Sequence, residues 1–224
     1  MSKLVQIWVN GCEPMPMECS IEIPQDVVDF VEVVAALNPT FRVYIGGGYL
    51  RDLFTNREPK DIDIFFVPRD HNYTYHRALG VPAGGYINYR RDSGDISTDL
   101  QERGVFEVTG IFMGKLSTSE VQYIVYGYGD IDGPYALAED MDMNICQIAW
   151  EVGNSYAIVT DHFWKGHRDR FIECLHDYDK ERMYHRYERM KAKYPCYEEV
   201  GKPGDEYKRP ESKRIHAGSF RNVD

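Results

Sequence analysis

Residues 44–64 have the sequence YIGGGYLRDLFTNREPKDIDI, and this stretch determines the architecture expected for the chain. Residues 41–45 are rich in β-formers, a run of glycines follows at 46–48, a helical pattern covers 49–55, and a second strand is expected at 61–67. Glycine lets a backbone approach a ligand closely and adopt positive φ. The amides of Gly47 and Gly48 would then lie at a helix N-terminus, where phosphate groups bind readily. The stretch predicts a strand–turn–helix–strand unit with a phosphate-binding site in the turn.

Two aspartates begin the second predicted strand. Side chains alternate between the faces of a strand, so Asp61 and Asp63 should project on one face, with Cα atoms roughly 6–7 Å apart. Ile62 and Ile64 should project on the other face, into the core. Carboxylate oxygens are hard ligands for divalent cations. Two such cations can clamp the attacking and leaving oxygens of a phosphoryl displacement, so the pair predicts metal-assisted phosphoryl transfer.

Three other phosphate or metal motifs are excluded by the residues present. A P-loop requires Gly-Lys-Ser/Thr after its glycines, whereas Tyr49 and Leu50 follow here. The dinucleotide pattern GxGxxG fails because Arg51 stands at the last glycine position. A calcium loop beginning at Asp140 fails because Ile145 stands where that loop needs glycine.

Composition narrows the function classes further. The chain has 224 residues and a formal charge of −10, and its pI near 5.2 argues against a general nucleic-acid coat. Five cysteines without CxxC spacing indicate neither a disulfide framework nor a zinc cluster. No run approaches the roughly 18 apolar residues of a membrane span, and the N-terminus lacks the apolar core of a secretory signal. We therefore expect a soluble, cytoplasmic protein without a membrane partner.

The order of expected elements indicates an α+β fold, mixed α/β in character. Strands are expected at 4–9, 19–23, 41–45, 61–67, 105–113, 121–126, 143–150 and 156–159. Helices are expected at 26–37, 49–55 and 134–139, with two more within 163–193, and a loop at 69–104. The predicted organisation is a head domain at 1–160, a helical appendage at 161–195 and a polar, flexible tail at 196–224.

The central stretch resembles the head domain of tRNA nucleotidyltransferases (CCA-adding enzymes) and bacterial poly(A) polymerases, within the DNA polymerase β-like superfamily. The matching positions are Gly47, Gly48, Leu50, Arg51, Asp52, Arg57, Lys60, Asp61, Asp63 and Ile64. The resemblance implies a mixed sheet backed by helices and transfer of a nucleoside monophosphate from a nucleoside triphosphate to a hydroxyl, with two Mg²⁺ ions. It implies that Asp61 and Asp63 are catalytic metal ligands. It assigns substrate binding to Gly47, Gly48, Arg51, Asp52 and Lys60, with Arg51 and Asp52 supporting the phosphate site or the helix start.

The same resemblance suggests a third carboxylate. Asp142 matches the aspartate of the family's Arg-Arg-Asp-Phe motif, while Asp140 and Met141 replace the two arginines. Asp142 is therefore the expected third catalytic and metal-binding residue, able to accept the proton of the attacking hydroxyl. Glu107, on an expected sheet strand, is the alternative.

The acceptor is left open by the sequence. Basic residues are frequent over 165–193, and residues 181–189 resemble the family's neck helix, so an RNA 3′ end could bind there. A protein or small-molecule acceptor would use the 69–104 loop instead. A catalytically silent nucleotide-binding or interaction protein is the main alternative, and a plain nucleic-acid-binding protein is another. The family's RNA-binding body is missing, which suggests a phage or mobile-element protein.

Overall fold

The computed structural model describes residues 2–10, 13–14, 19–69, 79–80, 88–89, 108–116, 119–126, 133–175 and 180–201. The strands are β1 (Ser2–Val9), β2 (Glu13–Pro14), β3 (Ile21–Pro24), β4 (Phe41–Gly46), β5 (Asp61–Pro68), β6 (Asn88–Tyr89), β7 (Val108–Leu116), β8 (Ser119–Tyr126), β9 (Ile148–Glu151), β10 (Tyr156–Val159), β11 (Phe171–Glu173) and β12 (Glu198–Val200). The helices are α1 (Gln25–Leu37), α2 (Gly48–Phe54), α4 (Pro134–Glu139), α5 (Asp161–Asp169) and α6 (Lys180–Lys193), with a 3₁₀ turn η2 (Asn144–Cys146). None of the helices in these ranges is both long and apolar enough to cross a bilayer.

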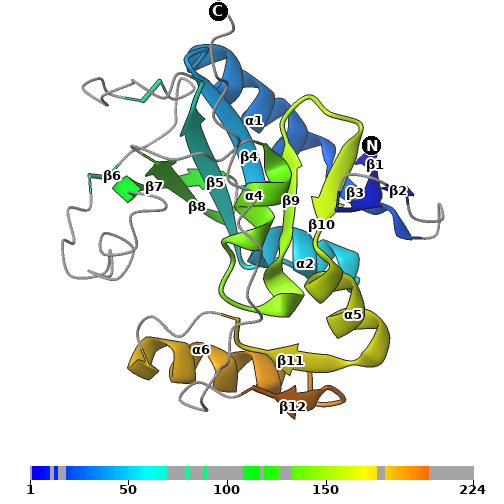
Figure 1. The fold of residues 1–224 in the computed structure, drawn as a ribbon. Coiled ribbons are helices and arrows are strands. Elements are labelled where there is room, and N and C mark those ends of the chain that lie inside the picture. The colour runs from blue at the N-terminus through cyan, green and yellow to red at the C-terminus, as the bar shows by residue number, and fades with distance from the viewer. Residues whose placement is uncertain are drawn as a thin grey trace, which may run out of the picture.

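A mixed sheet organises the molecule (Figure 1). Within the described ranges it has ten strands, in the order β2-β1-β10-β9-β4-β5-β8-β7-β6, and β3 pairs with the first half of β1. The central strand β5 runs antiparallel to β4 and parallel to β8, and β1 runs parallel to β10. This arrangement confirms the predicted α+β, mixed fold, including the strands expected around 41–45, 61–67 and 121–126.

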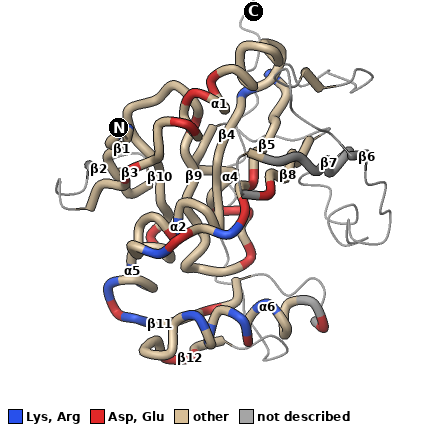
Figure 2. The backbone as a smooth tube through the Cα atoms, turned by 180° about the vertical axis from the view of Figure 1, so that it is seen from behind, with Lys and Arg blue, Asp and Glu red and all other residues tan. Residues whose placement is uncertain are grey.

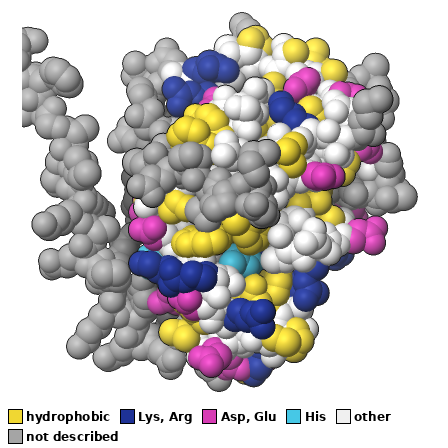
Figure 3. Space-filling view, turned by 90° about the vertical axis from the view of Figure 1, so that its right-hand side faces the viewer, with side chains coloured by type: hydrophobic (Ala, Val, Ile, Leu, Met, Phe, Trp, Pro, Cys, Tyr) yellow, Lys and Arg dark blue, Asp and Glu magenta, His cyan; other side chains and the backbone are white. Residues whose placement is uncertain are grey.

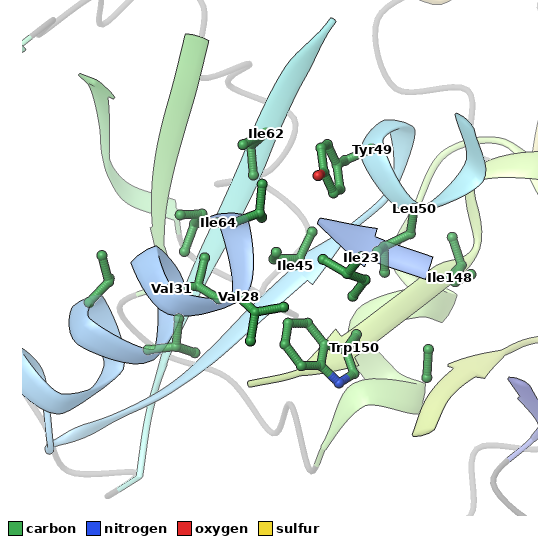
Figure 4. Close-up of a cluster of buried hydrophobic side chains, with 14 of the residues drawn as sticks. Ile23, Val28, Val31, Ile45, Tyr49, Leu50, Ile62, Ile64, Ile148 and Trp150 are labelled. Atoms are coloured by element: carbon green, nitrogen blue, oxygen red, sulfur yellow. The ribbon is translucent and has the colours of Figure 1, made fainter. Parts of the chain in front are cut away.

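The hydrophobic core forms where α1 covers one face of the sheet. Ile62 and Ile64 of β5 are fully buried there and point toward Val28 and Val31 of α1 (Figure 4). At about 25 cal/mol per Å² of buried apolar surface, side chains of this size contribute roughly 1.5–3 kcal/mol each. Because alternate residues of β5 are committed to this core, the residues between them face the opposite side.

A small C-terminal layer, made of β11, α6 and β12, lies at one end of the sheet (Figure 1). The prediction of two helices within 163–193 is wrong for residues 171–173, which form β11. Arg170, with φ 57°, ends α5 in the left-handed region, and the chain then pairs in parallel with Glu198–Val200. That pairing also places β12 inside the segment expected to be a flexible tail, whose residues 202–224 lie outside the described ranges.

Other boundaries shift by a few residues. The expected strand at 105–113 is β7 at Val108–Leu116, and the one at 143–150 divides into η2 and β9. Most of the expected 69–104 loop lies outside the described residues. Within it, Leu79 is buried, and Asn88–Tyr89 form the edge strand β6.

Asn144 joins the C-terminal layer to α5 and η2. Its side-chain Nδ2 donates to the Phe171 carbonyl oxygen at 3.1 Å, and its Oδ1 accepts from the Glu173 amide at 2.9 Å. Asn144 is fully buried, and Gly166 of α5 packs directly against its amide group. A side chain at position 166 would therefore collide with the group that holds β11.

We predict that Gly166→Ala destabilises the protein by roughly 1–3 kcal/mol, because overpacking of this kind forces neighbouring groups to shift. The sign is informative, since Gly→Ala inside a helix normally stabilises by up to about 1 kcal/mol. Chemical denaturation of the variant, with Lys165→Ala on the exposed face of α5 as control, measures the effect. An increase in the free energy of unfolding for Gly166→Ala would contradict the packing described here.

Candidate active site

Strand pairing brings the two aspartates beside the glycine bend. In the β4–β5 ladder Ile45 pairs with Ile64, so the glycine bend begins one residue after a residue whose partner directly follows Asp63 on β5. Gly47 has φ 64°, a value that favours glycine, and the next residue begins α2. The Gly47 amide donates to the Ile148 carbonyl oxygen at 3.0 Å, which ties the bend to the neighbouring strand. The strand register thus places the start of the bend and Asp63 at the same end of the β4–β5 ladder.

Asp61 and Asp63 share a face of β5 and are both partly buried. Burial, together with the negative charge of Asp61, raises the pKa of Asp63 to about 6, while Arg186 and Arg51 oppose part of that rise. Two neighbouring carboxylates in a desolvated site repel each other until a cation or proton compensates them. The pair is therefore electrostatically suited to a divalent cation.

A buried glutamine shapes the turn that leads to Asp142. The Gln147 side chain donates from Nε2 to the carbonyl oxygens of Glu139 and Met141, at 3.0 and 3.2 Å. Thr160 in turn donates its hydroxyl to Gln147 Oε1 at 2.5 Å. These contacts hold residues 139–141 in place, and so they fix the direction from which Asp142 enters the site.

Asp142 is paired with an arginine from the C-terminal layer. Its Oδ2 accepts from a terminal nitrogen of Arg186 at 2.8 Å. Its Oδ1 is buried and has no hydrogen-bond partner within the part of the chain that the structure describes. Across the same residues, no three His, Cys, Asp or Glu side chains gather into a metal-binding group. Asp61, Asp63 and Asp142 therefore do not form such a group among the described residues, and the Asp142 carboxylate is paired with Arg186 instead. The alternative, Glu107, lies outside the described residues.

Met141 packs against the glycine bend. A Cβ atom on Gly46 would come within 3.1 Å of Met141 Cε, and one on Gly47 within 3.4 Å of its Sδ. A Cβ on Gly48 would meet the Arg51 guanidinium at 3.6 Å. The side of the bend where side chains would project is thus covered by Met141 and Arg51.

Arg51 and Asp52 attach α6 to α2. The Arg51 guanidinium donates from Nε and one terminal nitrogen to Asp52 Oδ1, at 2.9 and 2.8 Å. Its other terminal nitrogen lies 3.1 Å from both Cys146 Sγ and Met190 Sδ. Lys193 donates to Asp52 Oδ2 at 2.5 Å. Both predicted substrate-binding residues are therefore buried in a network that positions the C-terminal layer, whereas Lys60 is exposed immediately before β5.

The basic residues of 165–193 are extensively paired with acids. The ion pairs are Arg168–Asp169, Arg186–Asp142, Lys191–Glu199 and Lys193–Asp52. Figure 2 shows basic and acidic residues side by side along this layer, and the face drawn in Figure 3 carries them interspersed. A continuous positive surface, which a nucleic-acid backbone would require, is not formed by these pairs.

The sequence reasoning did not identify three residues near the aspartates. The pattern around Arg186 is typical of a solvated basic helix, with Arg186 or His185 as a possible substitute for the base-selecting residue of the resembled family, and nothing in it places Arg186 beside Asp142. Glu120 and Gln122 of β8 are in register with Asp61 and Asp63. Parallel pairing of β5 with β8 could have suggested them, but strand neighbours in a mixed sheet are not legible from spacing alone.

Comparison with known proteins identifies both a family and a fold. The model of the Gabija anti-defense 2 family matches residues 23–170. A structure of a CCA-adding enzyme with ATP aligns with a TM-score of 0.53 and 14% identity, over 80% of this chain and 40% of that one. The Thermotoga maritima CCA-adding enzyme complexed with tRNA gives a TM-score of 0.53 at 13% identity, with the same coverage. The chain thus has a nucleotidyltransferase-like fold and spans about 40% of the length of these two enzymes. No curated protein matches the chain.

We predict that Asp63→Asn stabilises the protein at pH 7–8 by roughly 1–3 kcal/mol, since each unit of pKa shift corresponds to about 1.4 kcal/mol. The Asp63 pKa is raised in the folded state to about 6 from 3.8, so the wild-type protein loses stability as the pH rises through that interval. The difference between variant and wild type should therefore open between pH 4 and 6. Denaturation in the presence of a chelator, with exposed Asp29→Asn as control, measures it. Equal stability of Asp63→Asn and wild type at pH 7 would contradict the described electrostatics.

Proposed function

The chain belongs to the Gabija anti-defense 2 family, and we propose that it is a metal-dependent nucleotidyltransferase. In the proposed reaction a hydroxyl oxygen bonds to the α-phosphorus of a nucleoside triphosphate, the bond to the β-phosphate breaks, and pyrophosphate leaves while the hydroxyl proton passes to a base. The observation that carries the proposal is the position of Asp61 and Asp63 on one face of β5, directly beside the glycine bend. The fold shared with CCA-adding enzymes supports it.

The residues present fit a divalent cation such as Mg²⁺. Asp61 and Asp63 offer hard carboxylate oxygens from the same face of a strand, and their mutual repulsion favours a bound cation. The buried, unpartnered Oδ1 of Asp142 is a further oxygen whose burial calls for a positive or donating group. A divalent cation held by Asp61 and Asp63 would polarise phosphate oxygens and favour the ionised form of an attacking hydroxyl.

The chain's own groups then have distinct tasks. Burial and the charge of Asp61 raise the pKa of Asp63 to about 6, and this unfavourable charge is what a bound cation would compensate. Asp142 presents a carboxylate that can accept the proton of the acceptor hydroxyl. The Gly47 backbone, fixed by its bond to Ile148, keeps α2 and the bend rigid against β9. Pre-set positions of this kind lower the cost of aligning substrates.

We further propose that the acceptor hydroxyl belongs to a protein side chain of the Gabija defence system and that the chain is a phage protein. The family description supports the biological setting. The protein acceptor is favoured over RNA because the net charge is −10 and three basic residues of α6, namely Arg186, Lys191 and Lys193, are paired with acids. Nucleotidylation of such a hydroxyl would add a bulky anion to the target.

A second function, a catalytically silent interaction protein of the same fold, is favoured by two observations. Met141 covers one side of the glycine bend. Arg186 engages Asp142, and the three carboxylates do not form one metal-binding group among the described residues. Such a protein would block the defence system stoichiometrically without consuming nucleoside triphosphate.

We predict label transfer from α-³²P nucleoside triphosphate to a purified Gabija protein in the presence of Mg²⁺, with tRNA as the competing acceptor. Asp61→Asn and Asp63→Asn should each reduce the transfer by at least about 100-fold, because the loss of one metal-binding carboxylate removes several kcal/mol of transition-state stabilisation. EDTA should abolish the transfer, and Asp29→Asn should leave it unchanged.

The other possible outcomes separate an error in the acceptor class from an error in the proposed catalytic activity. Label on tRNA alone would show that the acceptor class is wrong. Absence of label on any acceptor, with Gabija inhibition retained by Asp61→Asn, would establish the silent alternative.

A further inference from the structure

We propose that Arg186 of α6 binds the triphosphate of the incoming nucleotide, so that the C-terminal layer forms one wall of the active site. The inference rests on the proposed nucleotidyl transfer. It assigns a substrate-binding residue to a helix that sequence patterns suggest only as a surface for RNA.

Arg186 already lies among the acidic groups of the site. Its guanidinium contacts Asp142 at 2.8 Å, and it is close enough to Asp63 for the two charges to stabilise each other. The side chain retains 27% exposure, so it borders both the site and the solvent. A guanidinium has five N–H donors, and the ion pair with Asp142 uses one terminal nitrogen. Donors therefore remain for an anionic ligand.

The other two cations of this region are committed elsewhere. Arg51 gives two hydrogen bonds to Asp52 and contacts two sulfur atoms, and Lys193 binds the second oxygen of the same carboxylate. Releasing either would leave Asp52, which is only 3% exposed, as a buried and poorly compensated charge. Arg186 can leave Asp142 at lower cost, because the Asp142 side chain is 17% exposed.

Because Asp142 is more exposed than Asp52, we expect Arg186 to be the cation that leaves its carboxylate partner and binds the phosphates of the nucleotide. A triphosphate adds several negative charges beside Asp61 and Asp63, so a mobile cation is drawn toward it. A planar guanidinium can donate two parallel hydrogen bonds to phosphate oxygens, whereas the contact between Arg186 and Asp142 uses only one of its nitrogens. As Arg186 turns to the phosphates, the Asp142 carboxylate is freed to accept the proton of the acceptor hydroxyl.

Equilibrium binding separates this role from a structural one. We expect Arg186→Gln to weaken binding of ATP, or whichever ribonucleoside triphosphate binds best, by roughly 10- to 100-fold, the equivalent of one charged hydrogen-bonded contact. Binding of the matching monophosphate should change by less than about threefold, since the lost contact is to the β- and γ-phosphates. Arg186→Lys should be intermediate, and Arg189→Gln, exposed on the same helix, should bind like wild type.

Asp142→Asn provides the decisive contrast. If Arg186 serves the triphosphate, removing its resting partner keeps or increases triphosphate affinity, opposite to Arg186→Gln. If Arg186 only anchors α6, both variants lower the thermal midpoint together and weaken triphosphate and monophosphate alike, which would overturn the inference. Triphosphate binding that depends on Asp61 but not on Arg186 would also overturn it while leaving the proposed function intact. Absence of any triphosphate binding by wild type would refute both.

Discussion

The pairing of β5 with β4 and β8 determines which side of the sheet each β5 side chain occupies. Ile62 and Ile64 must enter the core under α1, so Asp61 and Asp63 must appear together on the opposite face. A slip of one residue would reverse every side chain and bury both carboxylates in a hydrocarbon environment. The energy of the core therefore enforces the geometry of the acidic pair, and the same register pairs Ile64 with Ile45, the residue before the glycine bend.

Buried charge links this sheet to the C-terminal layer. Asp52 of α2 holds Arg51 and Lys193 at once, and Tyr194 adds a hydroxyl at 3.3 Å. Removing one member of such a network exposes the others to an uncompensated, desolvated charge. The residues that resemble a substrate-binding motif thus stabilise the placement of α6. Through α6 they also determine where Arg186 meets Asp142.

Local patterns predicted the parts of the fold that depend on neighbouring residues. The alternation of β5, the apolar spacing of α1 and the glycine bend were all legible, because each arises within a few residues of sequence. The local pattern predicts a helix at residues 171–173, because short apolar runs fit both the helical and the strand period. Their strand conformation depends on pairing with residues 198–200, far along the chain. The Arg186–Asp142 contact and the role of Gln147 cannot be predicted from local sequence either, because both depend on segments that meet only in the folded molecule.

The segment that follows α6 has a practical consequence for protein engineering. Tyr197 shares a hydrogen bond of 2.9 Å with His167 Nδ1, and β12 completes the small sheet with β11. Shortening the polypeptide at the end of α6 would remove the Tyr197–His167 hydrogen bond and the β11–β12 pairing. It would also remove the Tyr194 hydroxyl that donates to Asp52. Trimmed versions made for crystallisation should therefore retain every residue through Gly201, and affinity tags belong beyond that point.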